Sequence, residues 1–232
     1  MRAGKFRLRK LFLDWSPEFT PYLSQLGEVK TLEFLAVRGC GVEDHSFRSM
    51  MDALKVNKVR LKLLDLYSNR LTDDSIEYLS DFVHDYKFVE SLGFGMNSIR
   101  RLSSFEGLFE RLGTIEVGKA DFDLFREEWK QRENLISKNA KSKLAKKPEE
   151  PLPYIEEVLM DEAAGKYYKK QYPNLLYLNL VGNTLEKEPD YSHLESMMKR
   201  TANIQLILSY TKIEKYLDPK VIENYSPRIY VK

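Results

Sequence analysis

The stretch LKLLDLYSNRL, residues 61–71, decides the fold of this chain. It fits the frame L-x-x-L-x-L-x-x-N-x-L, in which x is any residue, at every fixed position. Residues 175–185 match the frame completely, and residues 89–99 differ from it only by exchanges between apolar residues. Residues 32–42 form a fourth match, in which Cys40 replaces the asparagine. Four such matches in one chain indicate an internal repeat.

Weaker copies of the frame extend the pattern toward both ends of the chain. They carry serine, alanine or threonine at the asparagine position. Together the frames begin at residues 8, 32, 61, 89, 112, 175 and 203. Successive frames begin 23 to 29 residues apart, except for a gap of 63 residues between the fifth and the sixth. The sequence therefore predicts about seven repeats and one insertion.

The pattern within each frame predicts a strand followed by a helix. Apolar residues at the fourth and sixth positions place one face of a short strand in the core. The asparagine amide can bond backbone groups where the chain turns. Helical periodicity follows, as in residues 47–54 and 76–83. We expect parallel strands of one sheet that begin near residues 11, 35, 64, 92, 115, 178 and 206.

Over residues 8–213, apart from the insertion, the sequence resembles leucine-rich-repeat proteins. Spacings of 28 and 29 residues between frames are most similar to the ribonuclease-inhibitor subfamily. The resemblance implies an α/β fold, a horseshoe-shaped solenoid with a parallel sheet on its concave face and helices on its convex face. It also implies a protein that binds another macromolecule.

The whole chain, residues 1–232, is predicted to form a single domain. The insertion is expected as a charged, partly helical arm over residues 123–172, and residues 214–232 as a C-terminal cap. The arm contains a basic segment made of Lys138, Lys141, Lys143, Lys146 and Lys147. This segment is either a solvated surface or a secondary contact site. It has no interleaved aromatic residues or arginines, which favours protein over RNA as its partner.

The composition is that of a globular protein. Hydrophobic residues make up 43% of the chain, and a net charge of +2 gives no general attraction to nucleic acid or anionic membranes. Cys40 is the only cysteine, which excludes an internal disulfide and fits a reducing compartment. No segment approaches the roughly 20 apolar residues of a membrane helix. We expect a soluble, cytoplasmic protein with no membrane contact, and the nucleus or a cytoskeletal assembly as alternative locations.

The sequence offers little for catalysis. His45, His84 and His193 fall in predicted helices or the turns that lead into them, and the frame predicts a buried thiol at Cys40. Residues 93–95 read Gly-Phe-Gly, but no Gly-Lys-Ser/Thr follows them, as a phosphate-binding loop requires. We therefore expect no enzymatic activity, no metal, no cofactor and no small-molecule substrate.

Exposed strand positions beside the buried leucines predict a binding surface, because aromatic residues and arginine anchor protein interfaces. The candidate residues are Phe34, Arg38, Asp65, Tyr67 and Tyr177. Trp15 and Tyr210, at the two ends, are expected to cover the edges of caps. The leading hypothesis is a scaffold or adaptor that binds a protein through the concave face. The alternatives are an architectural subunit of a cytoskeletal or ribonucleoprotein assembly, and a small-GTPase regulator that uses Arg38.

Overall fold

The structure is a computed structural model that describes residues 7–86, 89–141, 158–170 and 175–231. The chain divides into two compact units. The first, called here the seven-stranded unit, comprises Met1–Leu112 and Pro173–Lys232. The second, the inserted unit, comprises Gly113–Tyr172 and contains the whole of the predicted arm.

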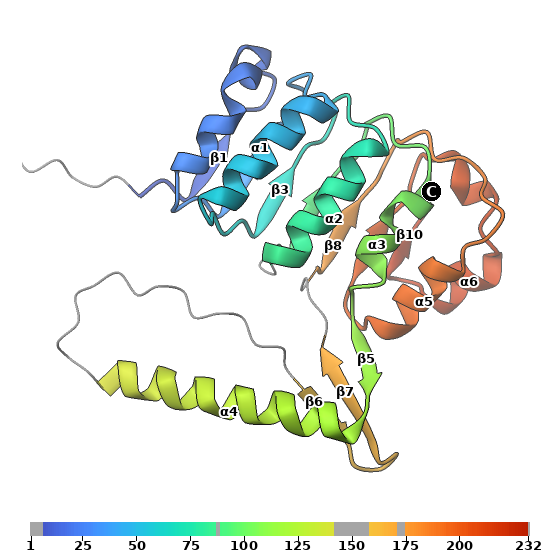
Figure 1. The fold of residues 1–232 in the computed structure, drawn as a ribbon. Coiled ribbons are helices and arrows are strands. Elements are labelled where there is room, and N and C mark those ends of the chain that lie inside the picture. The colour runs from blue at the N-terminus through green and yellow to red at the C-terminus, as the bar shows by residue number, and fades with distance from the viewer. Residues whose placement is uncertain (1–6, 87–88, 142–157, 171–174, 232) are drawn as a thin grey trace, which may run out of the picture. The chain divides into compact units, whose positions relative to one another are not determined.

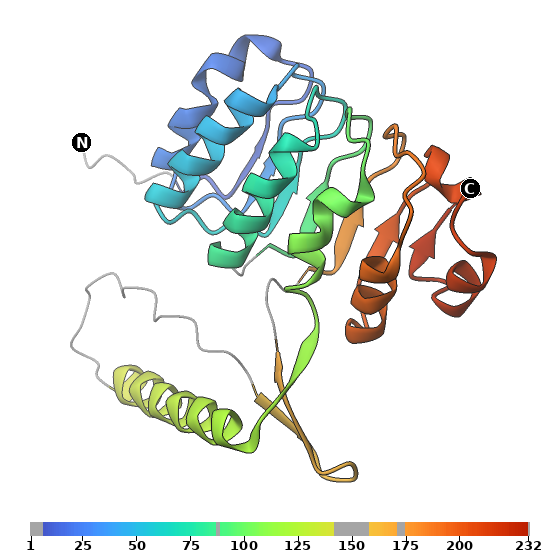
Figure 2. The ribbon, with the colours of Figure 1, turned by 45° about the vertical axis from the view of Figure 1, so that its right-hand side comes forward.

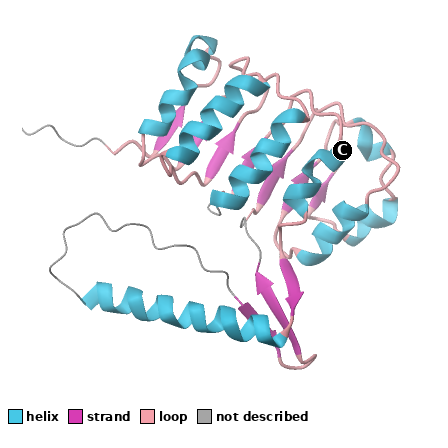
Figure 3. Ribbon diagram, in the orientation of Figure 1, coloured by secondary structure: helices cyan, strands magenta, loops and turns pink. Residues whose placement is uncertain are grey.

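The seven-stranded unit is a mixed α/β structure built on one parallel sheet (Figures 1 and 3). The strand order is β1-β2-β3-β4-β8-β9-β10, and every neighbouring pair is parallel. Strands that are neighbours in the sheet also follow one another in the chain, apart from β4 and β8, which flank the inserted unit. The strands are β1 (Lys10–Phe12), β2 (Phe34–Ala36), β3 (Leu63–Asp65), β4 (Ser91–Gly93), β8 (Tyr177–Asn179), β9 (Gln205–Ile207) and β10 (Ile229–Tyr230).

The buried leucines of the frames pair with one another across this sheet. Leu35 lies opposite Leu64, and Leu64 lies opposite Leu92. The same register continues from Leu92 through Leu178 to Leu206, and all five side chains are fully buried. A slip by one residue would turn each of them toward the other face, so burial fixes the register. The strands predicted near residues 11, 35, 64, 92, 178 and 206 are confirmed as parallel members of one sheet.

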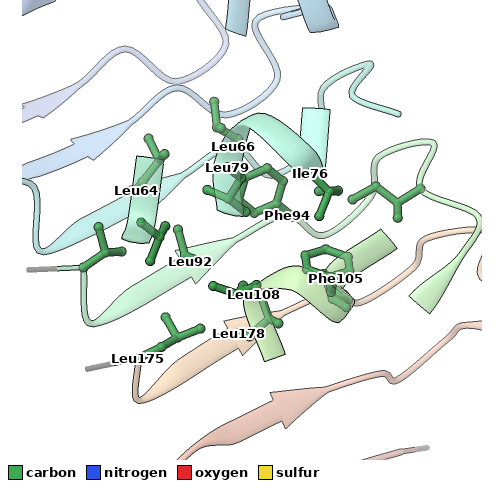
Figure 4. Packing of buried hydrophobic residues seen from close by; sticks show 14 of the residues in the cluster. Leu64, Leu66, Ile76, Leu79, Leu92, Phe94, Phe105, Leu108, Leu175 and Leu178 are labelled. Carbon is green, nitrogen blue, oxygen red and sulfur yellow. The ribbon is translucent and has the colours of Figure 1, made fainter. Parts of the chain in front are cut away.

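Helices lie on one face of the sheet. Figure 1 shows α1 (Asp44–Val56), α2 (Asp74–Tyr86) and α3 (Glu106–Phe109) side by side on this face, and the turned view in Figure 2 agrees. Their apolar side chains meet those of the strands in the core, where Phe94 lies close to Leu79 and Ile76 of α2 (Figure 4). The other helices of the unit are η1 (Pro17–Glu28), η2 (Leu102–Phe105), α5 (Ser192–Arg200), η3 (Lys212–Lys215) and α6 (Pro219–Asn224).

Asparagine side chains join successive frames at the turns that follow the strands. Oδ1 of Asn69 accepts hydrogen bonds from the backbone N–H groups of Cys40 at 3.1 Å and Val42 at 3.0 Å. Its Nδ2 donates to a carbonyl of the same neighbouring frame. Asn97 and Asn183 likewise bond the frame that lies beside theirs in the parallel sheet, residues 61–71 for Asn97 and residues 89–99 for Asn183. The predicted role of the amide is confirmed, and it satisfies backbone groups that would otherwise be buried without partners.

In the seven-stranded unit, the residue before each asparagine-type position has a left-handed backbone conformation. Six residues at this position have φ between 53° and 68°: Trp15, Gly39, Ser68, Met96, Gly182 and Tyr210. Glycine adopts such angles freely, whereas the other residue types are strained there. The same unusual turn therefore recurs at one frame position along the seven-stranded unit.

One predicted repeat does not join the parallel sheet. The frame at residues 112–122 predicts a parallel strand near residue 115, and this prediction is wrong. Instead, β5 (Thr114–Val117) pairs antiparallel with β7 (Lys166–Lys170) in the inserted unit. The seventh place in the parallel sheet belongs to β10, which comes from the segment predicted as the C-terminal cap.

The inserted unit combines a three-stranded antiparallel sheet with one long helix. Its strand order is β5-β7-β6, where β6 spans Val158–Asp161. The helix α4 (Lys119–Lys141) packs on this sheet through Phe122, whose ring centroid lies 4.8 Å from that of Tyr167. Helix and sheet also meet where the ammonium group of Lys169 in β7 lies 4.4 Å from the centroid of the Phe125 ring in α4.

The predicted basic segment is described only in part. Lys138 and Lys141 fall within α4. Lys143, Lys146 and Lys147 lie outside the described residues. A contact role for this segment therefore stays a prediction.

Candidate functional site

The parallel sheet presents rows of side chains on the face opposite to its buried leucines, because successive residues of a strand point to opposite faces. We call this surface the sheet face. The first row consists of Lys10, Phe34, Leu63, Ser91, Tyr177 and Gln205. The second consists of Phe12, Ala36, Asp65, Gly93, Asn179 and Ile207. Two residues further along the chain, the third row consists of Asp14, Arg38, Tyr67, Gly95, Val181 and Ser209.

A hollow of about 550 Å³ lies in the sheet face. Two glycines make room for neighbouring side chains of this region. A Cβ atom added at Gly93 would lie 2.5 Å from Oδ1 of Asp65, and one added at Gly95 would lie 2.9 Å from the ring of Tyr67. Any larger residue at these positions would therefore displace Asp65 or Tyr67. The residues that line the hollow are Trp15, Arg38, Leu63, Asp65, Tyr67, Ser91, Gly93, Tyr177 and Asn179.

An ion pair forms part of the lining. Nε and Nη2 of Arg38 each lie 2.8 Å from Oδ2 of Asp65, and Nη1 lies 3.7 Å from a carboxylate oxygen of Asp14. Oδ1 of Asp65 accepts a hydrogen bond from the backbone N–H of Tyr67 at 3.0 Å. The Arg38 side chain is 43% exposed, so these pairs contribute on the order of 1 kcal/mol or less to stability. Their main effect is to hold two carboxylates around one guanidinium.

Three aromatic side chains also line the hollow. Tyr67 and Tyr177 are half-buried, and burial raises the pKa of the Tyr177 phenol, with a smaller contribution from the negative charge of Asp65. This phenol therefore keeps its proton at neutral pH and can donate a hydrogen bond. Trp15 is 68% exposed, and its indole lies against Gly39, where an added Cβ would come within 2.1 Å of the ring.

No family model matches the chain, and no curated protein matches it. The polar and aromatic groups that line the hollow are aromatic rings, a guanidinium paired with a carboxylate, and neutral amide and hydroxyl groups. Groups of these kinds can bind and orient a ligand. Among the described residues, no three His, Cys, Asp or Glu side chains gather as metal ligands. In the same part of the chain, no helix has the length and apolar character that a bilayer crossing requires.

The hollow brings together most of the predicted binding residues. Arg38, Asp65, Tyr67 and Tyr177 all line it. Phe34 lies on the same face but outside the lining, and the Lys10 ammonium stands 4.9 Å from the centroid of its ring. The candidate set is thus one local site rather than a strip along the whole sheet.

Other lining residues were not among the predicted candidates. Trp15, expected to cover the edge of a cap, lines the hollow, while Tyr210 lies outside the lining. Leu63, at the first-row position of β3, is another such residue. Successive residues of a strand point to opposite faces, so Leu63 lies on the sheet face because the next residue, Leu64, is buried.

The cysteine and the histidines lie elsewhere. Sγ of Cys40 donates to the Leu13 carbonyl at 2.8 Å, and burial raises the pKa of this thiol, in agreement with the predicted structural role. His45 belongs to α1 and His84 to α2. His193 belongs to α5 and stacks on the ring of Phe109. None of these residues belongs to the lining of the hollow.

Proposed function

We propose that this chain is a leucine-rich-repeat solenoid whose sheet face is the concave, partner-binding side. Three independent features support the repeat. The frames pair in register across a parallel sheet, asparagine amides join consecutive turns, and the same left-handed turn recurs at one position of the frame. Each unit buries its apolar face only by stacking on its neighbours, as repeat proteins require.

The hollow in the sheet face carries the functional part of the proposal, in which the partner is a protein. Trp15, Tyr67 and Tyr177 are of the residue types that dominate the binding energy of protein interfaces. The two tyrosines stand on or directly after strands of a hydrogen-bonded sheet, so little side-chain and backbone entropy is lost when a partner docks. This combination favours a scaffold or adaptor.

The charge around the hollow argues against the phosphate-binding alternatives. The guanidinium of Arg38 is already paired with Asp65 and Asp14. A phosphate of GTP or of a nucleic acid would therefore meet two carboxylates together with one guanidinium. Binding to nucleic acid depends on an excess of positive charge, which this surface does not offer.

The proposal is tested by changing the sheet face and measuring affinity for a purified partner. Tagged full-length protein captures partners from cells that express it, and the partner that it holds is then produced and titrated by calorimetry. Trp15→Ser and Tyr177→Ser should each weaken binding by about 1–3 kcal/mol if they are anchors. Val56→Ser is the matched control, because Val56 is an exposed apolar residue at the end of α1.

The outcomes separate the alternatives. Equal binding by the sheet-face variants and the wild type would contradict the proposal. Loss of binding only after Lys141, Lys143, Lys146 and Lys147 are changed to glutamine, with strong dependence on salt, would assign the site to the basic segment. A partner that stays bound in a fixed ratio through every purification step would favour the architectural subunit over a transient adaptor.

A further inference from the structure

The hollow contains a carboxylate that its neighbours leave accessible. Asp65 is held by Arg38 at Oδ2, while Oδ1 accepts the backbone N–H of Tyr67. A carboxylate oxygen has room for more than one hydrogen bond. Oδ1 lies against the backbone of Gly93, where an added Cβ would come within 2.5 Å of it. The absence of a side chain at position 93 therefore makes room for the carboxylate itself, and 19% of the Asp65 side chain stays accessible to an incoming donor.

The fixed charges of the cluster leave an excess of negative charge. Two carboxylates, those of Asp14 and Asp65, share the single guanidinium of Arg38. All three side chains are partly exposed, with 27%, 19% and 43% of their surfaces accessible, so a partner can reach the cluster. The resulting charge of about −1 attracts a cation and repels an anion.

The rings that line the hollow favour the same kind of ligand. Trp15, Tyr67 and Tyr177 line it together with Asp65. The face of an aromatic ring attracts a guanidinium or ammonium group within about 6 Å. The aliphatic stem of an arginine or lysine also packs well against rings while its charged end reaches a carboxylate. Aromatic faces and an excess carboxylate thus point to one ligand chemistry.

We propose that the hollow receives a basic side chain, an arginine or a lysine, from the partner protein. Its charged group donates to the exposed part of the Asp65 carboxylate, and its stem packs against the rings of Tyr67 and Tyr177. An acidic side chain would face two carboxylates, and a neutral apolar one would leave the excess charge without a counterion. This inference rests on the proposed function, since it names the group that the sheet face recognises.

The test uses a small probe rather than an unidentified partner. Isotope-labelled full-length protein is titrated with N-acetyl-L-arginine methylamide, and the backbone amide signals are followed by NMR. The citrulline analogue is the matched neutral probe, and the leucine analogue is the apolar one. We expect the arginine probe to shift the signals of Asp65, Tyr67 and Gly93 saturably, and the two neutral probes to bind at least about fivefold more weakly.

Two variants and a control locate the binding. Gly93→Ala displaces the Asp65 carboxylate, which an added Cβ would approach to 2.5 Å, and Asp65→Asn removes the charge while keeping an oxygen. Each should weaken arginine binding at least about fivefold. Gly107→Ala is the control, because an added Cβ there meets only Ser80, at 4.0 Å. If Gly93→Ala fails to fold, the Asp65→Asn variant and the comparison of the three probes still test whether the hollow binds a basic side chain.

Each result bears on one of the two proposals. The inference is overturned if citrulline or leucine binds as well as arginine, or if Asp65→Asn leaves arginine binding unchanged. In either case, the proposed function stands as long as a captured partner still depends on Tyr177. The proposed function is contradicted by a different result, namely captured partners that bind the Trp15→Ser and Tyr177→Ser variants as tightly as the wild type.

Discussion

Two frames that look alike in sequence take different structures. The frame that begins at Val89 forms β4 of the parallel sheet, whereas the frame that begins at Leu112 forms β5 of an antiparallel one. Both carry apolar residues at the expected positions. They differ at the asparagine position, which is Asn97 in the first and Ala120 in the second.

The frames that join the parallel sheet share a polar group at that position. Each forms a hydrogen bond from its side chain to a backbone carbonyl: Ser16, Cys40, Asn69, Asn97, Asn183 and Thr211. Ala120 has no polar side-chain group and lies within the first turn of α4. The comparison teaches that apolar spacing alone does not define a repeat here, because the turn must also satisfy its buried carbonyls.

The largest expected difference between the two frames concerns the buried strand residue. Leu64→Ala should destabilise the seven-stranded unit by roughly 2–5 kcal/mol, because its fully buried side chain leaves a cavity. Ile115→Ala, at a half-buried position of β5, should cost less than about half of that. Chemical denaturation followed by circular dichroism measures both. Equal losses would contradict the assignment of the two strands to different environments.

The asparagine position itself should show the next largest effect. Asn97 accepts from the N–H of Leu71 and donates to the carbonyls of Leu66 and Phe94. Asn97→Ala should therefore cost about 1–3 kcal/mol, because buried backbone groups lose their partners. Ala120→Asn, the reciprocal change, should bring no stabilisation, since position 120 lies in a helix. Urea unfolding of both variants would check this, and a stabilised Ala120→Asn variant would contradict it.

A third effect depends on pH. Burial acts to raise the pKa of Asp44, but hydrogen bonds from Ser75 and Thr72 outweigh it and hold this pKa below its ordinary value. The stabilisation is then complete above the ordinary pKa and is lost as the pH falls through the lowered one. Asp44→Asn should cost about 1–2 kcal/mol at neutral pH and almost nothing in strong acid. Thermal melts across that pH range test it, and a loss independent of pH would contradict it.

The smallest expected effect is that of removing the inserted unit. Replacing Gly113–Tyr172 with a short glycine-serine linker should leave one cooperative unfolding transition, because these residues form a compact unit of their own. Loop entropy changes by only about 0.6 kcal/mol for each doubling of loop length. Differential scanning calorimetry would show the transition. Aggregated or molten protein after the deletion would mean that the seven-stranded unit needs the insertion.

The sequence predicts most strands of the parallel sheet because each frame has its buried apolar residues and its polar turn residue at fixed spacing. It does not predict β10, whose Ile229 pairs with Leu206 although it belongs to no frame. Nor does it predict the antiparallel pairing of β6 and β7, since that pairing depends on contacts across the insertion. Long-range pairing of this kind leaves no short repeating signal.

The candidate site is predictable to a similar extent. Alternation along the strands places Asp65 and Tyr177 on the exposed face, and residue type marks them as anchors. The roles of Gly93 and Trp15 depend instead on which residues lie next to them across the sheet. The spacing along one strand does not contain that information.

The left-handed turns also restrict the order of the repeats. Two large side chains at this position lie against a glycine of the frame beside them in the sheet: the ring of Trp15 lies on Gly39, and the sulfur of Met96 lies on Gly182. If the frames that begin at 32 and 61 were exchanged, Ser68 would take the place of Gly39, and its Cβ would collide with the indole. These two frames are therefore not interchangeable, and a gene rearrangement that exchanged them would have to replace Trp15 as well.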